Sequence, residues 1–144
     1  MLEYQHTTAD TANVGPQLKA LLGEGVISVV LFTSDGFPLA SADSLGREAT
    51  ERTCAAFSGM HSLHKGLAEF CHTAPGALRA RSQMIDFGTH TVLLVAAGQN
   101  SGLALAVEGG MNDSNVPLAL GKALKLTKAL EWFLAAGDRQ LQPG

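Results

Sequence analysis

The sequence predicts an α/β domain of the α+β type, with three layers (α/β/α) and one five-stranded antiparallel sheet. Five short strand-like segments follow one another, and tight turns join them within hairpins, which requires antiparallel neighbours. Two of these segments, residues 26–33 and 90–97, are apolar at nearly every position and therefore need cover on both faces. We expect the strand order 2-1-5-4-3, with one long helix on one face and two helices on the other.

Length and composition indicate one domain. The chain has 144 residues, 46% of them hydrophobic and 16% charged, which excludes an intrinsically disordered protein. We expect the domain to span residues 14–136, between a flexible arm at 1–13 and a flexible tail at 137–144. The net charge of −3 provides no basic surface for nucleic acid. The sequence has no signal peptide and no apolar run long enough for membrane insertion, so we expect a cytoplasmic protein.

The N-terminal third predicts a helix followed by a hairpin. Pro16 suits the first turn of a short helix, whose apolar stripe is Leu18, Leu21 and Leu22. A buried strand follows at 26–33, and Asp35-Gly36 predicts a two-residue hairpin turn. The returning strand contains Pro38, which places it at an edge of the sheet.

A long helix is expected over residues 46–72, with Asp43 or Ser44 as its cap. Spacings of three and four residues predict a core-facing stripe of Thr53, Ala56, Met60, Leu63, Leu67 and Phe70. Gly59 weakens the helix, which suggests that another backbone approaches it closely. Beside this stripe lies a second one, made of Cys54, Phe57, His61, His64, Ala68 and Cys71.

Three strands, at 78–87, 90–97 and 103–108, and a final helix complete the predicted domain. Ser114 or Asn115 is the expected cap of this helix, and Pro117 lies in its first turn. Its expected buried stripe is Leu120, Ala123, Leu124, Thr127, Leu130 and Leu134.

Three stretches, together with their order and spacing, resemble the roadblock/LC7 family. They are residues 30–40 in the first hairpin, residues 55–63 in the long helix, and the strand pair 92–97 and 103–107. The chain is most similar to the bacterial stand-alone members that act with small Ras-like GTPases. The resemblance implies a homodimer that regulates such a GTPase, either as an activator or as a scaffold. It transfers no catalytic motif.

The chemistry of the sequence does not indicate an enzyme. The Gly-Lys pair at Gly121-Lys122 is followed by Ala123, and Val116 stands where a phosphate-binding loop needs its first glycine. The chain is therefore not itself a P-loop GTPase, and we expect no catalytic residues, no bound cofactor and no metal site.

The second stripe of the long helix leaves two interpretations open. Its thiols and imidazoles are zinc-ligand types, but the spacing separates the cysteines from His61 and His64 by one and a half to three turns. The alternative is a half-buried seam against a second copy of the helix. A Cys–His nucleophile is disfavoured because Cys71 and His72 lie on different helix faces.

The strand at 78–87 lacks proline and carries few charges, so it predicts an open sheet edge that pairs with its own copy. The residues expected in the dimer interface are Phe57, Met60, His61, His64, Ser82 and Met84. The residues expected to face the GTPase are Arg47, Glu51, Arg52 and Lys65. Each of Arg47, Arg52, Arg79 and Arg81 is a candidate for an inserted arginine, although an ordinary surface role is the commoner one. The alternative function is a small-ligand or metal-sensing signalling domain of the same architecture.

Overall fold

Five antiparallel strands form one sheet in the order β2-β1-β5-β4-β3, as the sequence predicts. The structure, a computed structural model, describes residues 9–42, 45–62, 66–131 and 134. The strands are β1 (Val26–Thr33), β2 (Pro38–Ser41), β3 (Ser82–Asp86), β4 (His90–Ala97) and β5 (Ser101–Glu108). The three longest strands are neighbours at the centre, so β2 and β3 form the edges.

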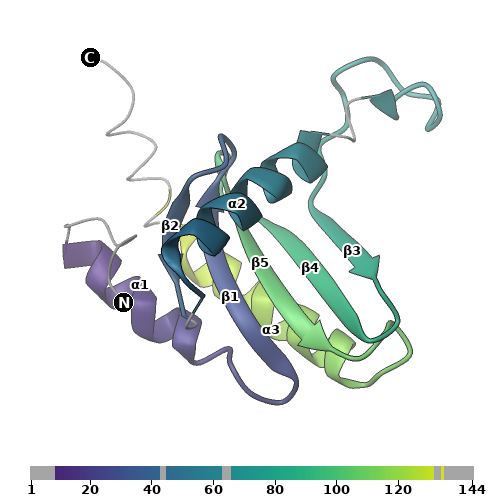
Figure 1. Cartoon of the computed structure of the whole chain (residues 1–144). Coiled ribbons are helices and arrows are strands. Elements are labelled where there is room, and N and C mark those ends of the chain that lie inside the picture. The colour runs from purple at the N-terminus through teal and green to yellow at the C-terminus, as the bar shows by residue number, and fades with distance from the viewer. Residues whose placement is uncertain (1–8, 43–44, 63–65, 132–133, 135–144) are drawn as a thin grey trace.

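Helices cover both faces of this sheet, which confirms the three-layer arrangement. α2 (Arg47–Ser62) crosses one face, whereas α1 (Ala9–Lys19) and α3 (Asn115–Ala129) pack on the other (Figure 1). The two faces follow from the alternation of side chains along each strand. Leu93 and Val95 of β4 join the core beneath α1 and α3, and Leu94 between them faces α2.

The two cores differ in size. The core under α1 and α3 contains Val14 and Leu18 of α1 together with Val116, Ala119 and Ala123 of α3. The core under α2 is a small cluster, made of Val30, Phe32, Cys54, Phe57, Leu94 and Ala104. Its centre is an aromatic pair, Phe32 and Phe57, with ring centroids 5.2 Å apart. α2 is therefore held by few apolar contacts.

Two predicted boundaries are wrong. The expected N-terminal arm reached residue 13, but α1 already begins at Ala9. Val14, one helical turn before Leu18, is buried in the core and anchors the helix on the N-terminal side of Pro16. The expected long helix reached residue 72, but α2 ends at Ser62. The last turn of α2 already lies beside the edge strand β3, where Gln83 bonds to the Met60 carbonyl, so a longer helix would gain little further packing on the sheet.

The face of α2 that is buried against the sheet differs from the predicted face. Thr50, Cys54 and Phe57 face the sheet, whereas Ala56 is exposed. Leu67 and Phe70 lie beyond α2 and are also exposed, and Leu63 lies outside the described residues. The burial of Thr50 is possible because its hydroxyl donates to the carbonyl of Gly46 at 2.9 Å. Small and polar residues on both sides of this helix make its apolar face ambiguous in sequence.

Local side-chain bonds account for the remaining differences. The first hairpin has a three-residue turn, because the Thr33 N–H donates to the Phe37 carbonyl and Gly36 adopts φ +94°. α3 begins after Asp113, whose carboxylate accepts the N–H of Asn115 at 2.8 Å, and Ser114 makes no side-chain cap bond. The stripe of α3 includes Ala119 in place of Leu124, which is exposed.

Gly102 provides a test of the α2-side core. A Cβ at this position would lie 2.5 Å from Cζ of Phe32, whose ring is fixed by Phe57. We expect Gly102→Ala to lower the free energy of unfolding by about 1–3 kcal/mol, measured by urea denaturation. The matched control is Gly59→Ala in α2, where a Cβ meets no atom within 4 Å. This control should raise the free energy of unfolding by up to about 1 kcal/mol; equal effects of both changes would contradict the packing described.

Candidate interaction surface

The outer edge of β3 pairs with no other strand among the described residues. The Phe87 N–H donates to the His90 carbonyl, and the Ala96 N–H donates to the Arg81 carbonyl. In an antiparallel pair these bonds recur at every second residue, so Arg81, Gln83, Ile85 and Phe87 bond towards β4. The backbone groups of Ser82, Met84 and Asp86 therefore point outwards. Met84 is 43% exposed, and this edge offers a row of donors and acceptors to another strand.

The opposite edge is protected. β2 has only four residues and begins with Pro38, which has no N–H to donate. α1 and α2 both contact β2 as they cross their faces of the sheet. Of the two edges, β3 is thus the one suited to pairing with a further strand.

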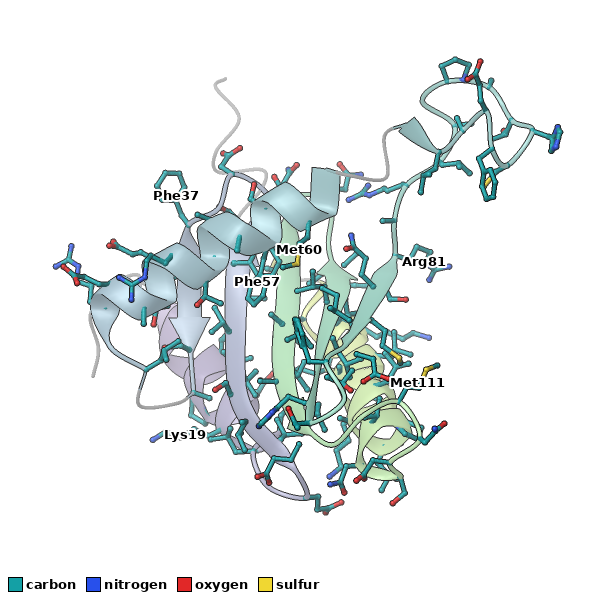
Figure 2. The ribbon with its side chains drawn as sticks, turned by 45° about the vertical axis from the view of Figure 1, so that its right-hand side comes forward. Lys19, Phe37, Phe57, Met60, Arg81 and Met111 are labelled. Atoms are coloured by element: carbon teal, nitrogen blue, oxygen red, sulfur yellow. The ribbon has the colours of Figure 1, made fainter. Side chains whose placement is uncertain are left out.

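The β3 edge is connected to the C-terminal end of α2. Nε2 of Gln83 donates to the backbone carbonyl of Met60 at 3.2 Å, which satisfies one of the last carbonyls of the helix. Met60 is half-buried against the α2-side core, and Phe57, which is 8% exposed, points into that core (Figure 2). Ser82 and Met84 lie on the edge as predicted, whereas the side chain of His61 and all of His64 lie outside the described residues.

The charged residues of α2 gather at its other end. Arg47 pairs with Glu51 at 3.9 Å, and Arg52 pairs with Glu48 at 3.9 Å, one helical turn apart in each case. All four side chains are largely exposed, so these pairs contribute little to stability. They form a mixed-charge surface over the β2 side of the sheet. The fourth predicted GTPase-facing residue, Lys65, lies outside the described residues.

The four candidate arginines have different surroundings. The guanidinium of Arg79 donates to the carbonyls of Gly98 at 3.1 Å and Gln99 at 2.5 Å, so it is committed to the β4–β5 turn. Arg81 lies at the start of the β3 edge and points away from the body (Figure 2). Its side chain has no hydrogen bond or ion pair with the part of the chain that the structure describes. Arg47 and Arg52 are in the helical ion pairs of α2.

The predicted second stripe of the long helix does not lie on one surface. Cys54 is fully buried under α2, and Cys71 is exposed beyond the end of the helix. Burial, with a smaller contribution from the charge of Glu51, raises the pKa of the Cys54 thiol to about 12. Among the described residues no three His, Cys, Asp or Glu side chains come together as metal ligands. This arrangement gives no support to the zinc interpretation.

A small hollow also bears on the ligand-sensor alternative. It lies where β3 begins and is lined by residues that include Phe32, Ala80, Gln83 and Leu94. Its volume is about 10 Å³, which is about the size of one water molecule and far below that of a metabolite site.

The segment between α2 and β3 is a feature that the sequence analysis misplaced. Residues 66–81, which we call the α2–β3 arm, leave the body of the domain and return to it (Figure 2). The sequence patterns predict helix for seven of them and strand for four. Gly66 and Pro75-Gly76 are the signals in the sequence that favour an irregular segment here. The bond from Arg79 to the β4–β5 turn fixes the returning end of the arm.

The strand order and the three layers define the class of domain, and comparison identifies the family. The model of the Roadblock/LC7 domain matches residues 18–107. The chain belongs to the Roadblock/LC7 domain family.

Solved structures share this fold. A Roadblock/LC7 domain from Streptomyces avermitilis superposes with a TM-score of 0.68 at 18% identity, over 84% of this chain and 97% of that one. A structure described as MglB with tetrameric arrangement gives 0.69 at 17% identity, over 88% and 91%. The gliding protein MglB from Thermus thermophilus gives 0.64 at 15% identity, over 88% and 96%. No curated protein sequence matches the chain. No helix among the described residues has the length and apolarity needed to cross a membrane.

The two cysteines make a direct test of the site geometry. At pH 8 we expect Ellman's reagent to react rapidly with Cys71 in the folded protein, and with Cys54 only after unfolding. The thiolate is the reacting form, and a pKa of about 12 leaves Cys54 almost entirely protonated. Folding raises this pKa above the value of about 8.5 in the unfolded chain. The free energy of unfolding therefore falls as the pH rises above about 8.5, because the unfolded chain loses the proton more easily.

Cys71→Ser is the control for this measurement and should remove the rapid phase. Two rapidly reacting thiols in the folded wild type would show that Cys54 is accessible.

Proposed function

We propose that the chain is a homodimeric regulator or adaptor of a small Ras-like GTPase, that it acts in the cytoplasm, and that it has no enzymatic activity of its own. The observation that carries the dimer is the unpaired outer edge of β3. If β3 pairs antiparallel with its copy around Met84, Ser82 faces the partner's Asp86 and the two sheets become one. This register uses the whole length of the strand and pairs every outward backbone group.

The two-fold axis of such an antiparallel pair is perpendicular to the sheet, so both α2 helices lie on the same face of the dimer. Their C-terminal ends, tied to β3 by Gln83, meet near the axis. The mixed charges of Arg47, Glu51 and Arg52 then lie towards the two outer ends of this surface. Membership of the Roadblock/LC7 family supports a GTPase as its occupant. Charges of both signs favour selective and fast association with such a protein.

Any effect on hydrolysis acts through the GTPase's own switch loops. The sequence has no phosphate-binding loop of its own. Arg79 is bound to backbone carbonyls, and Arg47 and Arg52 are held in pairs along α2. Arg81 lies at the start of the β3 edge, which the proposed dimer uses for pairing. Binding that orders the switch loops of the partner is therefore the proposed mechanism, in place of an inserted arginine.

Met84→Lys tests the dimer. Two lysines would face each other across the axis, and we expect light scattering to change from a dimer mass to a monomer mass at micromolar concentration. Leu118→Lys is the matched control, because Leu118 is a similarly exposed apolar residue on α3, away from the edge. It should leave the dimer intact. A monomeric wild type, or a dimeric Met84→Lys, would contradict β3 pairing.

The GTPase surface is tested with the Ras-like GTPase encoded nearest to this chain. We expect Arg52→Glu to weaken binding of that GTPase at least tenfold by calorimetry, because it reverses a charge on the exposed face of α2. Lys125→Glu, on the exposed face of α3, is the control. Absence of binding in either nucleotide state, with the dimer present, would contradict the GTPase partner.

Hydrolysis rates distinguish the two mechanisms. Single alanine changes at Arg47, Arg52, Arg79 and Arg81 should each reduce any acceleration of GTP hydrolysis by less than about tenfold when the complex is saturated. A loss of about 10³ or more for one of them, with binding unchanged, would identify an arginine finger and contradict the switch-loop mechanism.

A further inference from the structure

No helix among the described residues lies over one half of the α2-side face of the sheet. α2 crosses the half that contains Phe32 and Leu94, and Figure 1 shows the other halves of β1, β5, β4 and β3 without cover. The register places Ser28, Ala106, Val92 and Ile85 side by side across this half, and all four are only half-buried. We call these four residues the bare strip. It ends at Phe87, which is 63% exposed.

The α2–β3 arm has apolar side chains without cover. Phe70 is 81% exposed, and Leu67 and Leu78 are exposed as well. Figure 2 shows the arm projecting past the β3 edge, away from the sheet of its own chain. Arg79 fixes the returning end of the arm to the β4–β5 turn.

The proposed two-fold axis relates these two surfaces. β3 begins beside the arm and ends at Phe87, and its antiparallel copy runs in the opposite direction. The arm of one chain therefore comes to lie at the end of the sheet where the partner's β3 finishes and the partner's β4 begins. The axis is perpendicular to the sheet, so the arm, which continues from α2, reaches the partner on the α2 side. The bare strip of the partner lies on this same face of its sheet and at this same end of its strands.

We propose that the α2–β3 arm of each chain docks on the bare strip of a second copy, with Phe70 as its apolar anchor. The proposal rests on the dimer proposed above and adds a second, reciprocal contact to it. In the same register Arg81 lies opposite the partner's Phe87, which places a cation beside an aromatic ring. The occupant is this chain itself, because the arm and the strip are brought together by the same axis that pairs the β3 edges. The dimer would then bury the apolar side chains of the arm against the part of the sheet that α2 does not cover.

The dissociation constant of the dimer measures the contribution of the arm. We expect Phe70→Ala to raise it at least tenfold by sedimentation equilibrium, because a large aromatic side chain loses its burial twice in each dimer. Phe37→Ala is the matched control, since Phe37 is also a largely exposed phenylalanine, in the β1–β2 turn at the other edge of the sheet. Thermal melts at low concentration check that both variants fold.

A cross-link decides whether the contact is between chains. One chain keeps Cys71, which is exposed and lies next to the Phe70 anchor, and the other carries Cys71→Ser and Val92→Cys; a short bis-maleimide is added to the mixture. We expect a covalent dimer from the mixture and none from either variant alone. A chain that carries both Cys71 and Val92→Cys should form products between chains and none within a chain.

The outcomes separate this inference from the dimer itself. If the wild type is dimeric but no covalent dimer forms, or if Phe70→Ala dissociates like Phe37→Ala, the arm does not dock and the β3 dimer stands. If the chain that carries both Cys71 and Val92→Cys reacts within itself, the arm folds onto its own sheet and the inference is overturned. If the wild type is monomeric, both proposals fail.

Discussion

The area of a five-stranded sheet is the constraint on which this molecule depends. Five strands at about 4.8 Å spacing make a face more than 20 Å wide, whereas one helix with its side chains is about 10–12 Å across. Two helices, α1 and α3, cover one face with a large core. Within the described part of the chain, the other face has only α2 and a small core. The described helices therefore leave part of one face uncovered.

The uncovered area runs across the sheet from β1 and reaches the edge that is also unpaired. β2 has a proline and contacts with two helices, while β3 keeps its outward backbone groups and has no charged side chain between Ser82 and Ile85. Of the eleven large hydrophobic residues that are exposed among those described, six belong to this region. They are Leu67, Phe70, Leu78, Met84, Phe87 and Met111. Apolar surface gathered in one region is typical of an interaction surface, whereas scattered apolar residues need no explanation.

The parts of the fold that the sequence predicts are those decided by local patterns. The two doubly covered strands, the proline of the edge strand and the tight turns are sufficient for the strand order and the layers. The face of α2 is not decided in this way, because Thr50 and Cys54 are buried while Ala55 and Ala56 are exposed. The end of α2 is not decided locally either, since it depends on where the sheet beneath it ends. Arg79 illustrates the limit for the site: its bonds to Gly98 and Gln99 join residues 19 and 20 positions apart, and no spacing rule reveals them.

The hydrogen bond between Gln83 and Met60 joins the two parts of the candidate interaction surface, the edge of β3 and the helix α2. The side chain of Gln83 comes from the strand whose outer edge is unpaired, and it satisfies a carbonyl at the end of the helix that carries the mixed charges. The backbone of Gln83 pairs with β4, so its amide holds the last turn of α2 at a fixed place beside the edge strand. The open edge of β3 and the C-terminal end of α2 are therefore parts of one rigid arrangement, and a partner that binds one of them meets the other in a defined position.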